Sequence, residues 1–203
     1  MIAVALVVYL IGLFVAFGLR TWDHFRRTGS TGFNGVSGHA GSLSWWGGVL
    51  FIVALAFGLA SPVLAILHVV PGLTLTSSAS TVLAWIGLVL LVLGIALTVV
   101  AQAGMGTNWR IGVNPADRTD LVTSGLFGHT RNPIFTGMII AQVGLTLAVP
   151  SIPSILALSF LIAAIHIQVR TIEEPHLARV HGDDWLTYMS RTGRYFPRRM
   201  SQD

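Results

Sequence analysis

The stretch that decides the fold is residues 134–169, IFTGMIIAQVGLTLAVPSIPSILALSFLIAAIHIQV. It contains no Lys, Arg, Asp or Glu, and it is interrupted at Pro150-Ser151-Ile152-Pro153. Two prolines at this spacing favour a tight turn between two helices. The stretch therefore predicts a helical hairpin inside a membrane, with segments at about 134–149 and 151–169.

Charged clusters stand at both ends of this hairpin. Arg131-Asn132-Pro133-Ile134-Phe135-Thr136-Gly137 opens it, and Arg170-x-x-Glu173-Glu174 follows it. Because a hairpin returns the chain to the side where it began, we expect the two clusters to meet at one membrane face. Charge gathered in such a place is commonly functional.

The composition is that of an integral membrane protein. Hydrophobic residues make up 53% of the 203 residues and charged residues 10%, and the mean hydropathy is +0.74. Three further apolar runs, at about 2–19, 45–68 and 82–103, are long enough to cross a hydrocarbon core as helices. We predict an all-α fold: one membrane domain, 1–203, forming a polytopic bundle of about five transmembrane helices. Residues 1–103 hold three spans; residues 104–203 hold a long loop, the hairpin and a C-terminal segment.

The charges also predict the topology. They fall in three blocks, Arg20 to Arg27, Arg110 to Arg131, and Arg170 to the C-terminus, which five spans place on one side. The arginine excess makes that side cytoplasmic and the N-terminus external. The first span carries its charges behind it, which predicts an uncleaved anchor. Basic residues that are all arginine favour a high-GC bacterial source, so we expect a bacterial cell membrane.

Several functional classes are disfavoured. The absence of cysteine excludes disulfides, thiolate catalysis and Cys-ligated metals, and the histidines match no familiar ligand spacing, so no metal is predicted. Arginines beside membrane spans favour contact with membrane lipids over nucleic acid. Gly104-x-Gly106 is too short for a dinucleotide fingerprint, and Ser124-Gly125 is no nucleophile elbow.

The connecting segments differ in character. Residues 28–44, rich in Gly and Ser, are expected to form a loose loop, and residues 71–81 a short external turn. Residues 104–133 are long and rich in apolar and aromatic side chains, so we expect them to fold against the bundle as part of a site. Pro175 suits the first turn of a new helix, interrupted at Gly182, that lies against the cytoplasmic face as an interfacial helix.

The two charged clusters supply candidate site residues. Asn132 before Pro133 predicts a helix start whose free N–H groups can receive a carboxylate, and Gly137 allows close approach of a ligand or a helix. Glu173 or Glu174 can bind an amino group. The alternatives are an ordinary helix cap after a positive-inside arginine, and a surface ion pair between Arg170 and Glu174.

The C-terminal half resembles the isoprenylcysteine carboxyl methyltransferase family of membrane enzymes. The resemblance runs from about Gln102 to Pro197 and is carried by four pieces of sequence. These are Thr119-Asp120-Leu121-Val122-Thr123-Ser124-Gly125-Leu126-Phe127; Arg131-Asn132-Pro133-Ile134-Phe135; Arg170-x-x-Glu173-Glu174 with Gly182-Asp183-Asp184-Trp185-x-x-Tyr188; and Arg194-Tyr195-Phe196-Pro197. Asn132 and Phe135 replace the family's usual His and Tyr, so neither position can act as an acid or a base.

The resemblance implies methyl transfer from S-adenosylmethionine to a lipidic or small hydrophobic acceptor. It implies cofactor contacts at Gln102, Leu121, Val122, Phe127, Asn132, Pro133, Phe135 and Glu174, to which the motif adds Arg131 and Gly137. It also implies that Arg170 lies near the reacting group. With Arg170 we expect Glu173 and Arg110 in catalytic roles, since arginines can orient an anionic acceptor and aromatic rings can face a sulfonium.

Two other functions remain open. Membrane sterol and steroid reductases, which use NADPH, look similar in the C-terminal region but generally have more spans. A non-catalytic membrane subunit on the same scaffold is compatible with the Asn132 and Phe135 replacements. The sequence also leaves open whether the acceptor is a carboxylate, a thiol, an amine or a lipid hydroxyl, and how many copies assemble.

Overall fold

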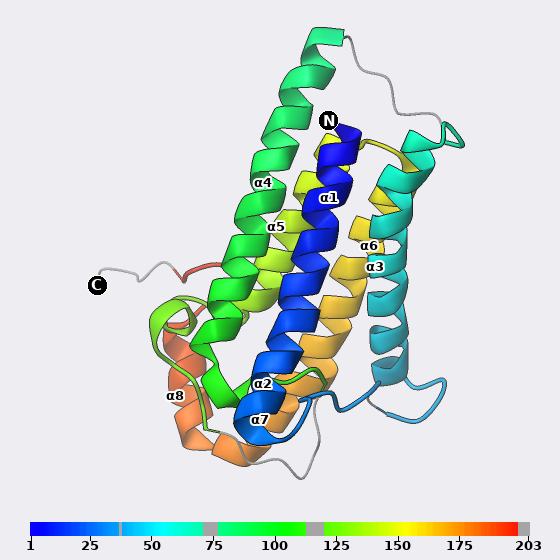
Figure 1. The fold of residues 1–203 in the computed structure, drawn as a ribbon. Coiled ribbons are helices and arrows are strands. Elements are labelled where there is room, and N and C mark those ends of the chain that lie inside the picture. Colours follow the sequence, from blue (N-terminus) through cyan, green and yellow to red (C-terminus); the bar gives the residue numbers. More distant parts are fainter. Residues whose placement is uncertain (37, 71–76, 113–119, 199–203) are drawn as a thin grey trace.

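The computed structural model describes residues 1–36, 38–70, 77–112 and 120–198, and within them the fold is an all-helical bundle, as predicted (Figure 1). The N-terminal helix is continuous through α1 (Ile2–Leu13), the π-helical segment η1 (Phe14–Leu19) and α2 (Arg20–Thr28). It is followed by α3 (Leu43–Ile66), α4 (Ser77–Gly104), η2 (Gly106–Asn108), η3 (Gly125–Gly128), α5 (Pro133–Ala148), α6 (Ile152–Ile167), the π-helical η4 (Gln168–Glu173), α7 (Glu174–His181) and α8 (Asp183–Arg191).

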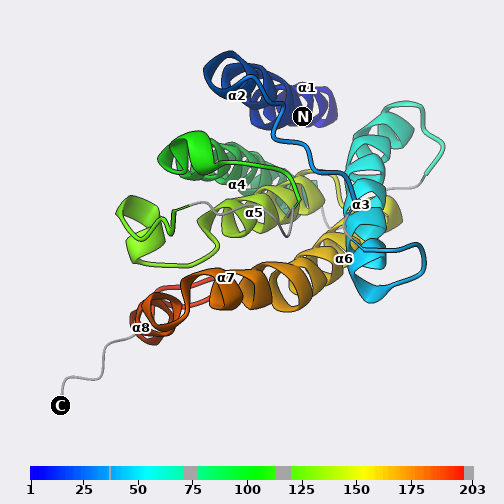
Figure 2. The same cartoon turned by 90° about the horizontal axis from the view of Figure 1, so that it is seen from below.

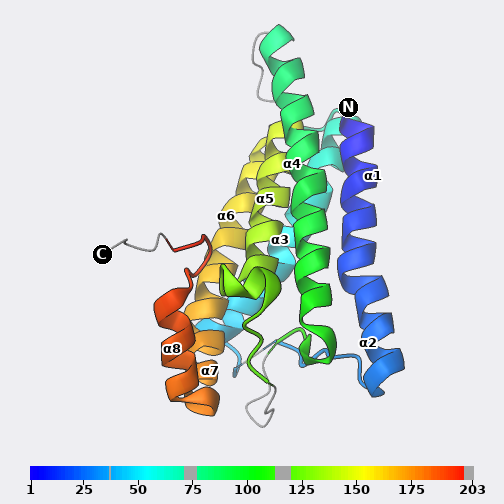
Figure 3. The same cartoon turned by 90° about the vertical axis from the view of Figure 1, so that its left-hand side faces the viewer.

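The observed lengths of the apolar helices vary over a wider range than the predicted lengths. Four stretches are long and apolar enough to cross a membrane, at Ile2–Thr28, Leu43–Ile66, Ser80–Gly104 and Ile152–His181. The fifth, α5, has 16 residues, or about 24 Å of helix, which is shorter than a hydrocarbon core. The first and last helices also run past their expected ends, because α2 and α7 continue them into the charged blocks (Figure 3).

The hairpin turn forms where the prolines predicted it. Ser151 is the N-cap of α6, and its side chain and that of Ser154 form a reciprocal capping box. Pro153 lies in the first turn of the helix, where its missing N–H costs nothing. The buried Ser151 hydroxyl lies 3.1 Å from that of Ser61 on α3, which ties the turn to a second helix.

Close helix packing holds α5 in place. A Cβ on Gly94 of α4 would lie 2.2 Å from the backbone N of Ala141, and one on Gly137 would lie 2.5 Å from Oγ1 of Thr98. Only glycine allows the two backbones to approach this closely. On the other side, α6 packs along α3 (Figure 2). Phe57 of α3 meets Phe160 of α6 edge-on.

The described parts of the three charged blocks gather at one end of the bundle, where α2, α7 and α8 lie (Figure 1). The loop at this end is more ordered than predicted. Phe33 pairs with Ile111 in an isolated bridge, and the Ile111 N–H donates to the Gly32 carbonyl at 2.7 Å. Most of the expected external turn, 71–76, lies outside the described residues, as does the middle of the long loop, 113–119.

Candidate functional site

A cavity of about 390 Å³ opens at the charged end of the bundle, between α3, α5, α6 and the two loops. Its lining combines two kinds of side chain. The apolar ones include Phe17, Phe51, Ile52, Leu55, Met138 and Ile165; the polar ones are Asn108, Arg110, Asp120, Arg131, Asn132, Gln168, Glu173 and His176, together with Gln102. The volume lies within the range of about 300–1,000 Å³ that is usual for small-ligand pockets.

Most of the residues expected to bind a cofactor line this cavity. They are Gln102, Leu121, Val122, Phe127, Arg131, Asn132, Pro133 and Phe135. Gly137 lies against α4 at Thr98, and neither Gly137 nor Glu174 belongs to the described lining. Among the three residues expected in catalytic roles, Arg110 and Glu173 line the cavity, whereas Arg170 is solvent-exposed and lies outside the lining.

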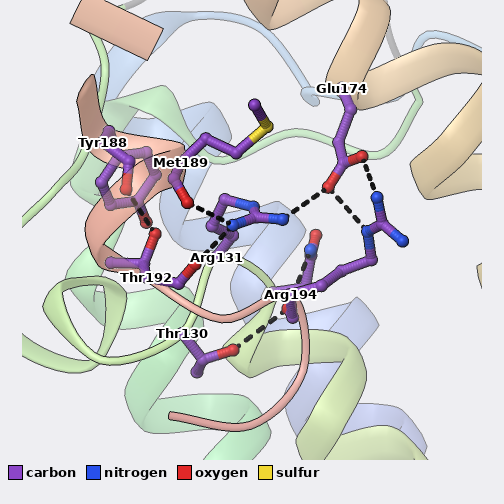
Figure 4. A network of polar contacts seen from close by, with 8 residues as sticks. Thr130, Arg131, Glu174, Tyr188, Met189, Thr192 and Arg194 are labelled. Atoms are coloured by element: carbon purple, nitrogen blue, oxygen red, sulfur yellow. Dashed lines mark hydrogen bonds and ion pairs between the residues drawn. The ribbon is translucent and has the colours of Figure 1, made fainter. Parts of the chain in front are cut away.

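The two glutamates of the acidic pair face different surroundings. Consecutive residues on a helix point about 100° apart, and Glu173 ends the π-helical segment η4 where Glu174 begins α7. Glu173 lines the cavity, where it interacts with Gln168 and Arg110. Glu174 accepts hydrogen bonds from Arg131 and Arg194 (Figure 4). The alternative ion pair between Arg170 and Glu174 is not formed in the described structure, because the Glu174 carboxylate is taken by these two arginines.

The chain from Thr192 to Arg198, here called the closing segment, fastens the Arg131 motif. Thr130 pairs with Gly193 in a parallel bridge, and the Arg131 N–H donates to the Gly193 carbonyl at 2.9 Å. The Arg194 carbonyl accepts from the hydroxyl of Thr130 and from the side-chain amide of Asn132, both at 3.1 Å. These contacts join segments about sixty residues apart and hold in place the three residues that precede α5.

Asn132 is the N-cap residue of α5, as predicted, with Pro133 at the first position. Its side chain makes no capping hydrogen bond and is used instead on the Arg194 carbonyl. The asparagine in place of the family's histidine therefore has a structural task in this chain. Phe135, the other replacement, lines the cavity as an aromatic wall.

Arg131 is almost fully buried, with a side chain only 8% exposed. Its Nη1 donates to the carbonyls of Met189 and Thr192, and its Nη2 donates to Glu174 at 3.3 Å. The guanidinium also lies 5.9 Å from the centre of the Trp185 ring. Burial with a carboxylate partner and an aromatic face makes this arginine a fixed positive charge at the cavity wall.

Two buried aromatic residues support the walls. The Tyr188 hydroxyl donates to the Phe127 carbonyl at 2.7 Å, and burial raises the pKa of Tyr188 to about 12, which keeps this donor protonated. Trp109 is buried, and Arg20 of the N-terminal helix lies 5.2 Å from its ring centre while donating to the Gly106 carbonyl. Helices at both ends of the chain therefore position the cavity.

Some lining residues were not among the expected site residues, although three of them, Asp120, Trp185 and Tyr188, stand in the motifs quoted above. Asp120, Gln168, His176, Trp185 and Tyr188 belong to the described lining. Asp120 directly precedes the predicted Leu121, and His176 lies three residues after Glu173 on one helix face. Gln168 carries no signal in the sequence, because its place in the cavity depends on how α6 meets the loop.

These features coincide with a family match. The sequence profile of phospholipid methyltransferases matches residues 82–184, slightly more than half of the chain. The chain belongs to this family. The family includes the isoprenylcysteine carboxyl methyltransferases, so the resemblance found in the motifs is confirmed. No curated protein matches the chain. The protein is a membrane methyltransferase, and its described helices fit an integral membrane protein.

Proposed function

We propose that this methyltransferase uses S-adenosylmethionine and methylates a lipidic or small hydrophobic acceptor in the cavity beside α5. One observation carries the proposal: a single cavity is lined both by apolar side chains of α3, α5 and α6 and by the charged residues Arg110, Arg131 and Glu173. A hydrophobic acceptor suits the first, and a charged, water-soluble methyl donor suits the second.

The residues present fit the methyl donor. Glu173 supplies a carboxylate for its amino group, and Arg110 or Arg131 supplies a cation for its carboxylate. The rings of Phe127, Phe135 and Trp109 offer faces for a base or a sulfonium. When bound, S-adenosylmethionine supplies an electrophilic methyl group on a positively charged sulfur.

The chain's own task is placement. The cavity residues orient the acceptor's nucleophilic atom toward the methyl group and exclude water, and such positioning provides much of the acceleration of transfer. Arg110 beside Glu173 can hold an acceptor that carries a negative charge. Asn132 and Phe135 cannot take a proton, so the acceptor must arrive ionised or lose its proton to another group.

We assign the two glutamates separate tasks. Glu173 meets the ligand, while Glu174 holds Arg131 and the closing segment in place. In the resemblance Glu174 was the cofactor contact. For it to touch a ligand, its bonds to Arg131 and Arg194 must first rearrange.

Equilibrium binding of tritium-labelled S-adenosylmethionine to the purified protein tests the donor. We expect saturable binding that becomes about tenfold weaker in Glu173→Gln, since a charge-assisted hydrogen bond is lost. Asp183→Asn is the matched control, because Asp183 is exposed on α8 and lies outside the described lining. Absence of saturable binding would overturn the proposal.

The reductase alternative is tested by thermal unfolding. A ligand that binds only the native state raises the melting temperature, so S-adenosylmethionine should stabilise the protein and NADPH should not.

The acceptor class is tested by mass spectrometry of lipid extracts incubated with the enzyme and labelled donor. Binding of the donor without any labelled product would favour a non-catalytic subunit.

A further inference from the structure

A second cavity, of about 360 Å³, is lined by Arg131 and by residues of α8 and the closing segment. Arg131, Arg194 and Arg198 line it, and its described lining contains no carboxylate. Arg131 also lines the first cavity, so the two cavities share this residue. The methyl-transfer proposal does not use this second cavity.

The charges around this cavity are only partly balanced. Among the described residues, the three lining arginines have one carboxylate as an ion-pair partner, that of Glu174, which pairs with Arg131 and Arg194. Arg194 uses Nε and Nη2 on that carboxylate, and Arg198 uses Nη1 on the Ser190 carbonyl. The other nitrogens of Arg194 and Arg198 make no hydrogen bond within the described residues. These remaining nitrogens can donate hydrogen bonds to an anion, and the net positive charge of the cavity lining favours its binding.

Apolar side chains flank the same place. Leu186, which lines the cavity, is 53% exposed, and Phe196 is 74% exposed. The backbone of Phe196 packs directly against the cavity-lining Gly193. The Tyr195 carbonyl accepts from Thr136 in the first turn of α5 at 2.9 Å. The closing segment therefore packs against the first turn of α5, and the arginine-lined cavity has the exposed Leu186 in its lining.

We infer that this cavity binds a phosphate group, and that its source is the headgroup of an anionic membrane lipid. Planar guanidinium groups match phosphate oxygens well, and more than one arginine is typical of phosphate sites. The exposed Leu186 and Phe196 would lie against the acyl part of the same molecule. The site is separate from the methyl-transfer cavity and touches it through Arg131.

Thermal-shift titration of the full-length protein in an uncharged detergent tests this site. The probes are a short-chain phosphatidic acid, the matching diacylglycerol without phosphate, and sodium phosphate. We expect phosphatidic acid to raise the melting temperature saturably, with a smaller effect at high salt, and the diacylglycerol to have no effect.

Arg198→Gln should raise the dissociation constant for phosphatidic acid about tenfold. Arg198 is exposed, so this variant is expected to fold.

Arg179→Gln is the matched control, because Arg179 is exposed on α7 and lines neither cavity. Leu186→Gln should weaken phosphatidic acid but not sodium phosphate. Stabilisation by sodium phosphate equal to that by the lipid supports the phosphate site and assigns it to a free anion. Equal stabilisation by the diacylglycerol, or equal losses in Arg198→Gln and Arg179→Gln, overturns the inference.

Discussion

Arg194 holds Glu174 with two parallel hydrogen bonds, from Nε to Oε1 at 2.8 Å and from Nη2 to Oε2 at 2.7 Å (Figure 4). This bidentate pair links the closing segment to the start of α7, and Arg131 reaches the same carboxylate from the other side. The hydrogen bond to Glu174 raises the pKa of Arg194. The closing segment is thus part of the site's framework, although it lies outside the region matched by the family profile.

We expect Glu174→Ala to lower the free energy of unfolding by about 3 kcal/mol, because it leaves the buried Arg131 without its carboxylate. Arg194→Gln removes the more exposed partner and should cost about 1 kcal/mol. A double-mutant cycle of the two positions, measured by denaturant unfolding, should give a coupling energy that differs from zero. A coupling energy of zero would mean that the pair does not fasten the segment.

Removing Arg110 should affect methyl transfer more than removing Arg170. Arg110 lines the cavity beside Glu173, whereas Arg170 is exposed and lies outside the lining. We expect Arg110→Gln to lower kcat/KM about 10- to 100-fold, as for a lost charge-assisted contact, and Arg170→Gln to change it less than about twofold. Both variants should keep the parent melting temperature. A large loss in Arg170→Gln would instead support the role near the reacting group that the resemblance implies.

Tyr188→Phe should lower the free energy of unfolding by about 1–3 kcal/mol, because the buried Phe127 carbonyl loses its donor. The tyrosine's ordinary pKa of 10.0 is raised to about 12. A raised pKa stabilises the native state below the ordinary value, and this contribution is lost as pH rises from about 10 through about 12. The parent protein should therefore lose stability over that window more steeply than the Phe variant. Identical pH profiles would contradict the assignment.

Gly137→Ala should destabilise the bundle by about 1–3 kcal/mol through overpacking. The added Cβ would lie 2.5 Å from Oγ1 and 2.7 Å from the backbone N of Thr98, so α4 and α5 must move apart. Gly104→Ala is the matched control on α4, where the nearest side-chain atom, on Phe127, is 3.8 Å away. Thermal unfolding of the two variants tests this, and equal stabilities would contradict the close packing.

The expected helical hairpin and the gathering of charged blocks at one end required only the sequence. Uncharged runs of membrane length leave helices as the form that satisfies every backbone hydrogen bond in lipid. The prolines around Ser151 mark the turn, and Pro133 after Asn132 marks the start of α5. Local rules of this kind also predicted the break at Gly182, where φ is +51°.

The directions of the two glutamates were decided only by the tertiary structure. Glu173 and Glu174 are identical side chains in adjacent positions, so no pattern in the sequence can tell which one lines the cavity and which one pairs with arginines. That choice depends on the phase of the π-helical segment before them and on where the closing segment lies. The same holds for Gly137: in the described structure its missing side chain lets α5 pack closely against α4, and no sequence pattern distinguishes this use from contact with a ligand.

The sequence by itself determined the membrane helices and the residue types near the site, because hydrophobic length and proline positions act locally. The tertiary structure decided which of those residues share a cavity. It brought Arg131 and Asn132 against the closing segment, about sixty residues away, by backbone and side-chain hydrogen bonds that leave no local mark in the sequence. Contacts of this kind depend on the packing of the whole bundle, and that packing places Glu173 in the cavity and Arg170 outside it.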